Sequence, residues 1–460
     1  KVRDALEIIR SREKVYVEVK KIKGKYYVYR STSEYDREKK KPVKKTEYMG
    51  RITPEGVFIP KRSKIQESSR EIFEYGNCML AYHFLKDVED ALKQLTPYSS
   101  EIIAFAIVKA VDPKPIRLLA SRWEKFYLSQ MMEANLNPKH VSRILRQLGE
   151  ETTLWYELFS KLINNDFLLY DLTAVSTCSS QKLAEKGYNA DHEYTDQIGV
   201  VMAFSTKDRV PVAVEVYYGS MKDISTLKDF LNRYPQRRIG FIFDRGFSSY
   251  KLLEELRREN IHYIVPLRKN SRYISIGQGT FSYRSRPIRW SRKEIDLGYV
   301  YIYDDPSLRG DEETALLRKV DAGKLTMEEY EEKRKVAGII GIISDLDLSG
   351  EEIFDLYKSR EDVEIAFDAM KNYMDADRTY MHTAEAVRGY FFITFLAMRV
   401  YFSILKRLRE EGLTNRISVN EALFELSKVT LIKERSGREY FAKIPKRAKR
   451  ILSLFPEAMG

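Results

Sequence analysis

Short apolar runs alternate with amphipathic stretches through the middle of the chain. The runs are rich in β-branched and aromatic residues, as in buried strands. Between the later runs, apolar residues recur at helical spacing, as in Leu227, Phe230 and Leu231. In chain order, the pattern predicts strands at 166–173, 200–204 and 212–218, a helix at 223–234, a strand at 238–244, a helix at 248–259 and a strand at 263–267. The fold class is therefore α/β, with a mixed sheet and flanking helices.

The first 62 residues are basic and rich in predicted strands. Apolar and polar residues alternate at 15–19 and 26–30, which indicates two half-buried strands. A basic run at 37–45 would form a loop between later elements. This segment is predicted to be a small domain of its own.

Helical spacing replaces this pattern from residue 63 onward. Asn137-Pro138 is typical of a helix start, and the helix after it would face inward through Val141, Ile144, Leu145 and Leu148. Lys139, Arg143 and Arg146 lie away from that face. They suit a helix-turn-helix-like reader of DNA or a plain helical bundle, and both interpretations stay open.

The segment from Tyr357 to Lys371 carries the most specific pattern in the chain. It reads Tyr-x2-Arg360-x3-Glu364-x6-Lys, and offsets of three, four and seven residues put side chains on one stripe of an α-helix. A second stripe is apolar and would anchor the helix; it comprises Val363, Phe367, Met370 and Met374. The polar stripe suits phosphoryl chemistry on a polyanion, although a solvated helix with ordinary ion pairs has the same composition.

Two aspartates upstream each end an apolar run. Asp171 ends the strand predicted at 166–173, and Asp244 ends the one at 238–244. One aspartate at a strand end is more often a turn or cap residue. Two of them together with Glu364 supply three carboxylates, whose oxygens are ligands that Mg²⁺ prefers. Chance explains that combination poorly.

These motifs resemble the DDE transposases of bacterial or archaeal insertion sequences, in the cut-and-paste group with the YREK signature. The matching segments include Asp171-Leu-Thr173, the turn at 244–247, the pattern at 357–371 and the stretch at 385–389. The resemblance extends over most of the chain. The predicted order of three strands, helix, strand, helix and strand is that of an RNase H-like fold.

The resemblance implies a site and a reaction. Asp171, Asp244 and Glu364 would be the catalytic residues and would bind two Mg²⁺ or Mn²⁺ ions. Tyr357, Arg360 and Lys371 would hold the DNA backbone near the cut; Arg245, Trp290, Lys139, Arg143 and Arg146 are further candidate DNA contacts. The expected reaction is binding of the terminal inverted repeats, two-metal cleavage through a hairpin, and joining of the 3′ ends to target DNA.

The implied partners are double-stranded DNA and a second copy of the chain in a synaptic complex. Two other interpretations fit part of the pattern. One is a transposase-derived DNA-binding protein without catalysis, which predicts damage to the three acids. The other is a different RNase H-like, metal-dependent nuclease, which leaves the full YREK spacing unexplained.

The interval 271–337 would be a β-rich insertion that interrupts the sheet. Strands are predicted at 281–283 and 300–303, and a charged helix at 326–335. Near its start, arginines surround Trp290 between residues 284 and 292, as on a surface that stacks on bases. A tryptophan in the core or at its rim is the alternative interpretation.

Charge and cysteine content agree with a DNA partner inside the cell. The chain has 79 Lys and Arg against 67 Asp and Glu, a net charge of +12 and a pI near 9.2, which favours a polyanionic partner. Two distant cysteines, Cys78 and Cys178, suggest a reducing cytoplasm, where the protein would associate with the nucleoid. The longest apolar run, 390–398, is too short to span a membrane. His192 is expected to form local hydrogen bonds.

At 460 residues the chain should hold several domains. The predicted divisions are 1–62 (β-rich, basic), 63–165 (helical, DNA-end-binding), 166–270 (first part of the core), 271–337 (insertion), 338–410 (second part of the core, with the YREK helix) and 411–460 (basic, dimerising).

Overall fold

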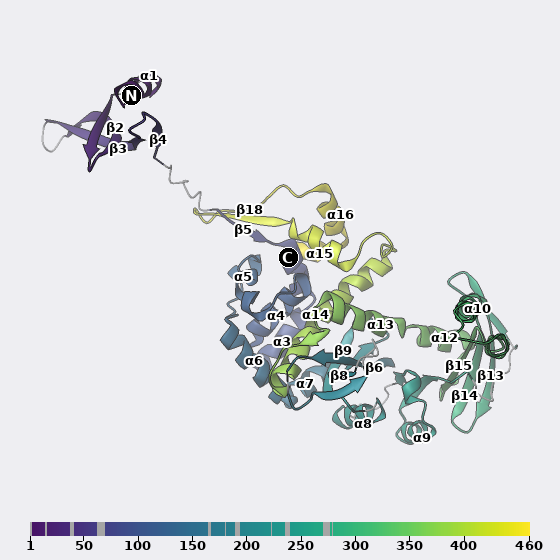
Figure 1. The fold of residues 1–460 in the computed structure, drawn as a ribbon. Coiled ribbons are helices and arrows are strands. Elements are labelled where there is room, and N and C mark those ends of the chain that lie inside the picture. The colour runs from purple at the N-terminus through teal and green to yellow at the C-terminus, as the bar shows by residue number, and fades with distance from the viewer. Residues whose placement is uncertain are drawn as a thin grey trace. The chain divides into compact units, whose positions relative to one another are not determined.

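The computed structural model describes residues 2–13, 16–36, 41–61, 70–163, 167–179, 181–188, 194–221, 223–234, 240–269, 277 and 279–460. Its residues group into two compact units (Figure 1). The smaller unit is Lys1–Glu71 with Ile432–Tyr440, and the larger is Ile72–Leu431 with Phe441–Gly460.

The smaller unit is built on an antiparallel sheet and one helix. Its elements are α1 (Val2–Glu13), β1 (Val17–Ile22), β2 (Lys25–Asp36), β3 (Lys41–Ile52) and β4 (Phe58–Pro60), and the strands pair in the order β1-β2-β3-β4. Both predicted strands are present as β1 and β2. Helix α1 was not predicted, although it places Ala5 and Ile9 against Val17, Val28 and Ile52 in a small core.

The larger unit contains a large mixed sheet, as predicted. Its first strands are β6 (Phe167–Thr177), β7 (Glu185–Tyr188), β8 (Tyr194–Ser205), β9 (Pro211–Tyr218), β10 (Gly240–Ile242) and β11 (His262–Pro266). Strand β8 is antiparallel to both β9 and β6, whereas β6, β10 and β11 run parallel. The order across the sheet is therefore β9-β8-β6-β10-β11. Helix α8 (Asp223–Arg233) lies between β9 and β10 in the chain, and α9 (Tyr250–Arg258) lies between β10 and β11.

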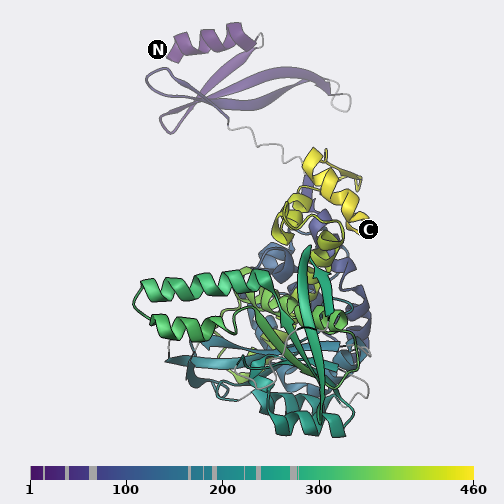
Figure 2. The same ribbon diagram turned by 90° about the vertical axis from the view of Figure 1, so that its right-hand side faces the viewer.

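The interval after β11 continues this sheet. Its elements are β12 (Gly279–Tyr283), β13 (Arg286–Ile295), β14 (Gly298–Asp304), α10 (Pro306–Asp321), α11 (Met327–Arg334) and β15 (Ile339–Ser344). The strands at 281–283 and 300–303 are confirmed. Strand β15 pairs with β14 on one side and β11 on the other. The expected insertion thus extends the main sheet edge to edge, and α10 and α11 form a hairpin beside it (Figure 2).

Further helices precede and follow the strands of the sheet along the chain. Those before it are α2 (Gly76–His83), α3 (Lys86–Leu95), α4 (Ser99–Val111), α5 (Leu119–Trp123), α6 (Pro138–Glu150) and α7 (Thr152–Leu162). Those after β15 are α12 (Gly350–Lys358), α13 (Glu361–Asp368), the π-helical turn η4 (Ala369–Tyr373), α14 (Ala384–Glu410), α15 (Val419–Ser427) and α16 (Lys446–Leu454).

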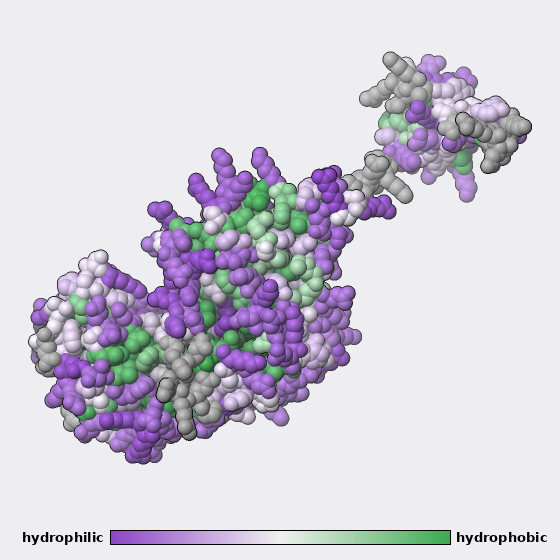
Figure 3. Space-filling model, turned by 180° about the vertical axis from the view of Figure 1, so that it is seen from behind, coloured by the Kyte–Doolittle hydropathy of each residue, from purple (hydrophilic) through white to green (hydrophobic). Residues whose placement is uncertain are grey.

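Short strands complete the fold. Strand β16 (Arg378–Thr379) pairs with β6, while β5 (Arg70–Glu74), β17 (Thr430–Glu434) and β18 (Glu439–Phe441) form a separate sheet. Seen from behind, the larger unit is mainly hydrophilic, with apolar residues in separate patches (Figure 3). No helix in the described ranges combines the length and apolarity that a membrane span requires.

Helix α14 is the central helix of the larger unit, and α6 crosses it at two glycines. A Cβ atom at Gly389 of α14 would overlap the carbonyl oxygen of Leu145, and one at Gly149 of α6 would overlap that of Glu385. The predicted inward face of α6 is confirmed, since Val141, Ile144, Leu145 and Leu148 are all buried. The two helix backbones therefore touch directly.

Valine in place of Gly389 is expected to lower the free energy of unfolding by about 1–3 kcal/mol, because the helices must separate to accept its side chain. Denaturant unfolding followed by circular dichroism measures this. Gly310→Ala is the control: it lies in α10 with nothing within 4 Å of its Cβ position, and alanine there should be neutral or slightly stabilising. Equal stability of Gly389→Val and the unmodified chain would contradict the close crossing.

Candidate active site

The expectation that Asp171 ends a strand was wrong, because β6 continues past it to Thr177 along β8. Asp244 follows the last residue of β10, the parallel neighbour of β6, by two positions. Gly240, Phe241 and Ile242 of β10 pair with Phe167, Leu168 and Leu169 of β6. Continuing this register by two residues places Asp244 level with Asp171. Adjacent strands are about 4.8 Å apart, so the two carboxylates start from neighbouring positions.

Strand alternation sets the direction of Asp171. Tyr170 packs against Phe230 of α8, with ring centroids 5.3 Å apart. The next residue, Asp171, therefore points to the opposite face of the sheet. Helix α13 packs against β6, which brings the segment with Glu364 to the same strand. Asp171 is half-buried, and its Oδ1 accepts a hydrogen bond of 2.9 Å from the Leu172 backbone N–H.

The YREK segment is not one regular α-helix, and this expectation was wrong. Helix α12 ends at Lys358, and backbone N–H groups at 360, 362 and 363 donate to the carbonyls three residues earlier. This tightened turn joins α12 to α13. Five residues after Glu364 the chain widens into the π-helical turn η4, which carries Lys371. The predicted apolar stripe is nevertheless buried at all four positions, Val363, Phe367, Met370 and Met374.

Arg360, in the turn between α12 and α13, connects two of the predicted acids. One guanidinium nitrogen donates to Asp244 Oδ1, and Nη2 donates to Glu364 Oε1 at 2.9 Å. The guanidinium carbon lies 5.8 Å from the centre of the Tyr357 ring. The structure thus brings Tyr357, Arg360, Glu364 and Asp244 together, although 120 residues separate the two acids in sequence.

The electrostatics of this cluster are coupled. Burial raises the pKa of the Tyr357 phenol, against the opposing effect of Arg360 and Arg245. Burial would by itself lower the pKa of the Arg360 guanidinium, but Tyr357, Asp244 and Glu364 together raise it above its ordinary value. Arg360 is therefore held as a cation at all accessible pH values.

Lys109 was missed by sequence reasoning, and it supports the π-helical turn. Its Nζ donates to the carbonyl oxygen of Met374 and to the Tyr390 hydroxyl, both at 2.8 Å, and lies 4.3 Å from the Tyr390 ring centre. Burial lowers the pKa of Lys109 to about 7. Next to it on α4, the Ala110 carbonyl accepts a 2.6 Å hydrogen bond from Tyr373 of η4. The available signal was a lone lysine inside an otherwise apolar helix.

Two further candidate DNA contacts lie near the YREK segment. Arg245 is exposed, directly follows Asp244 and is close enough to influence Tyr357. Trp290 is half-buried on β13, where its ring lies so close to Gly279 and Gly350 that a Cβ atom at either would overlap it. It therefore packs against the first residue of α12. Its role in base stacking stays a prediction.

The three cations predicted on α6 are exposed. Arg143 lies 2.7 Å from His140 Nδ1, and Arg146 donates to the Ser142 carbonyl at 3.4 Å; Lys139 follows the Asn137 cap. The apolar face of their helix is covered by α14. Their contact with DNA stays a prediction, as does the choice between a DNA reader and a bundle.

Three expectations fall wholly or partly outside the described residues. His192 lies in 189–193, and the basic run at 37–45 is described only from residue 41. The basic run enters β3 there rather than a loop. The start of the predicted insertion, at 271–276, is also outside the described ranges.

The chemistry of the donor set fits a divalent metal ion. Three carboxylates provide the hard oxygen ligands that Mg²⁺ and Mn²⁺ prefer. In the arrangement found, however, Arg360 lies between Asp244 and Glu364. Accordingly, no group of three or more Asp, Glu, His or Cys side chains in the described ranges is gathered closely enough to hold an ion.

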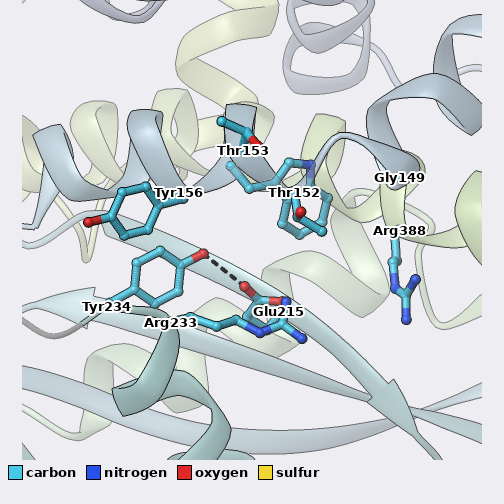
Figure 4. A pocket seen from close by; sticks show the side chains of 9 residues that line it. Gly149, Thr152, Thr153, Tyr156, Glu215, Arg233, Tyr234 and Arg388 are labelled. Atoms are coloured by element: carbon cyan, nitrogen blue, oxygen red, sulfur yellow. Dashed lines mark hydrogen bonds and ion pairs between the residues drawn. The ribbon is translucent and has the colours of Figure 1, made fainter.

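A cavity of about 470 Å³ lies on the other face of the sheet from Asp171 (Figure 4). Glu215 pairs with Val201, and Val201 pairs with Leu172. Because Leu172 directly follows Asp171, Glu215 and Asp171 point to opposite faces of the sheet. The buried Glu215 carboxylate accepts a 2.8 Å hydrogen bond from the Tyr234 hydroxyl. Burial raises the pKa of Glu215, while Arg233 and Tyr234 oppose that rise. This cavity is separate from the three predicted acids.

Comparison with known proteins identifies the family of the chain. The family model described as "Transposase DDE domain" matches residues 164–399, more than half of the chain, and that segment contains Asp171, Asp244 and Glu364. A solved structure described as a piggyBac transposase synaptic complex with hairpin DNA is 13% identical, with 72% of this chain and 70% of that chain covered and a TM-score of 0.38. No curated protein matches the chain. By the family match, the chain belongs to the transposase DDE-domain family.

Proposed function

We propose that this chain is a cut-and-paste transposase of the YREK group, with an RNase H-like core. The strand order β9-β8-β6-β10-β11, in which β8 alone of these runs against both neighbours, supports the proposed core. The family membership supports DNA as the substrate. The terminal inverted repeats of an insertion sequence would be bound first, and the 3′ ends would then be joined to target DNA.

Asp171, Asp244 and Glu364 are the residues that would hold Mg²⁺ or Mn²⁺ in this chain. When bound, two such ions supply a Lewis acid for the attacking and leaving oxygens of an in-line displacement. The planar fork of Arg360 suits a DNA phosphate, and the Tyr357 ring keeps the guanidinium oriented. Lys371, on the turn supported by Lys109, would neutralise a phosphate near the scissile bond.

The observation that carries this proposal is the cluster around Arg360. One guanidinium contacts an acid after β10 and an acid on α13, and the register of β6 places a third acid beside the first. An ordinary solvated helix would not bring these three distant positions together. A homodimer on paired ends and a hairpin intermediate complete the proposed reaction.

Metal-dependent nicking and joining test the proposal. A labelled duplex that carries the element's end, incubated with the protein and Mg²⁺ or Mn²⁺, should be nicked and then joined to a plasmid, while EDTA should abolish both products. Nicking without joining would favour another RNase H-like nuclease. Binding without nicking would contradict catalysis and favour a transposase-derived DNA-binding protein.

A further inference from the structure

Arg360 occupies the space between two carboxylates that are themselves open to solvent. Its side chain is 23% exposed, whereas those of Asp244 and Glu364 are 48% and 61% exposed. Small ions can therefore reach both acids from solvent. The arginine, in contrast, is fixed by its two ion pairs and by the Tyr357 ring.

A divalent cation and this guanidinium compete for the same two carboxylates. Arg360 uses Oδ1 of Asp244 and Oε1 of Glu364, and these are acids to which the proposed function assigns the metal. Two positive groups cannot share these oxygens at contact distance without strong repulsion. Either the arginine or the metal is accommodated at this pair of acids.

We propose that Arg360 guards the acids in the DNA-free chain and that a DNA phosphate draws it away, so that DNA binding admits the metal. This inference rests on the proposed function, because it takes Asp244 and Glu364 as metal ligands. A phosphate is a suitable competitor because it offers the guanidinium two oxygen acceptors in the geometry that a carboxylate pair provides. Arg245, exposed beside Asp244, adds positive charge that attracts DNA to this point.

Competition between Arg360 and the metal for these acids would make metal binding and DNA binding mutually dependent. Any factor by which DNA raises the affinity for metal must also be the factor by which metal raises the affinity for DNA. The chain would therefore hold little metal until DNA is seated. Idle cleavage of non-cognate phosphodiesters would be suppressed by the same contact.

The test measures Mn²⁺ affinity directly, by electron paramagnetic resonance of the free ion, on the full chain. Titrations are made without DNA and with a duplex whose pre-cut end carries a 3′-dideoxynucleotide, so that no strand can be joined. In the unmodified chain, DNA should tighten Mn²⁺ binding at least tenfold. Arg360→Gln should bind Mn²⁺ at least tenfold more tightly without DNA and gain less than threefold from DNA.

Arg258→Gln is the matched control, because Arg258 of α9 is exposed and pairs with Glu254 at 3.7 Å; less than a threefold change in Mn²⁺ affinity is expected. Arg360→Lys keeps the positive charge but loses the planar guanidinium, and its Mn²⁺ affinity without DNA should lie between those of the unmodified chain and Arg360→Gln. Unchanged Mn²⁺ affinity in both Arg360 variants, or an equal gain in affinity in Arg258→Gln, would contradict the proposed role of Arg360. If Glu364→Gln binds Mn²⁺ as the unmodified chain does, the metal assignment in the proposed function fails instead.

Discussion

Glutamine at position 364 is expected to lower the rate of DNA strand cleavage by roughly 10²–10³-fold or more, with little change in DNA binding. The substitution keeps the size of the side chain and its hydrogen-bonding oxygen, but removes the charge that a divalent metal requires. It also removes the ion pair between Arg360 and residue 364, while the ion pair between Arg360 and Asp244 is kept. Single-turnover cleavage of end-labelled DNA gives the rate, and fluorescence anisotropy gives the affinity.

Glu361→Gln is the matched control for this experiment. Glu361 lies on the same helix and is exposed, but it pairs with Arg284 at 3.1 Å and Lys358 at 3.9 Å rather than with Arg360. Exposed pairs of this kind contribute little, so the rate should change less than threefold. A Glu364→Gln protein that cleaves at the unmodified rate would remove Glu364 from the catalytic residues.

Methionine in place of Lys109 is expected to stabilise the fold most at and below neutral pH. Burial lowers the pKa of folded Lys109 to about 7, from 10.5 for the unperturbed group. Between these values the unfolded chain carries one more proton than the folded chain, so the free energy of unfolding rises with pH by about 1.4 kcal/mol per unit. Below pH 7 both states are protonated, and the full penalty of the buried charge applies.

The Lys109→Met protein should lack this slope, and denaturant unfolding at a series of pH values from 6.5 to about 9.5 measures the difference between the two proteins. Lys114→Met is the control: Lys114 is exposed and paired with Asp112 at 2.7 Å, and its removal should leave the slope unchanged. Strand cleavage should fall about tenfold in Lys109→Met, because Met374 and Tyr390 lose the donor that supports the turn with Lys371. If the free energy of unfolding of the unmodified protein and of Lys109→Met changed with pH by the same amount, the result would contradict a buried charge at Lys109.

Local patterns were sufficient to locate the acids but not to give their geometry. Asp244 could be placed after a strand because it follows an apolar run that forms a strand for local reasons, whereas the strand of Asp171 continues to Thr177 through its pairing with β8. The spacing of Tyr357, Arg360, Glu364 and Lys371 was interpreted as one helix because a regular helix is the simplest model of such spacing. The tightened turn at Arg360 and the π-helical turn at Lys371 depend on contacts from far away in sequence, including those of Lys109 and Ala110.

The sheet shows the same division between local and distant information. The local residue pattern predicted the strands at 281–283 and 300–303. It does not report which strand lies alongside. The pairing of Ile264 with Ser344 and of Tyr299 with the same residue is set by packing between segments that the pattern treats separately.

Strand β15 also determines whether this protein can be engineered in modules. Strand β15 pairs with both β14 and β11. Deleting 271–337 would remove β14 and leave β15 with an unpaired edge, two strands away from β10, which Asp244 follows. The same deletion would remove Trp290, which packs against Gly350 at the start of α12. The interval is thus a structural continuation of the main sheet, and chimaeras that exchange it would need to include β15 and the start of α12.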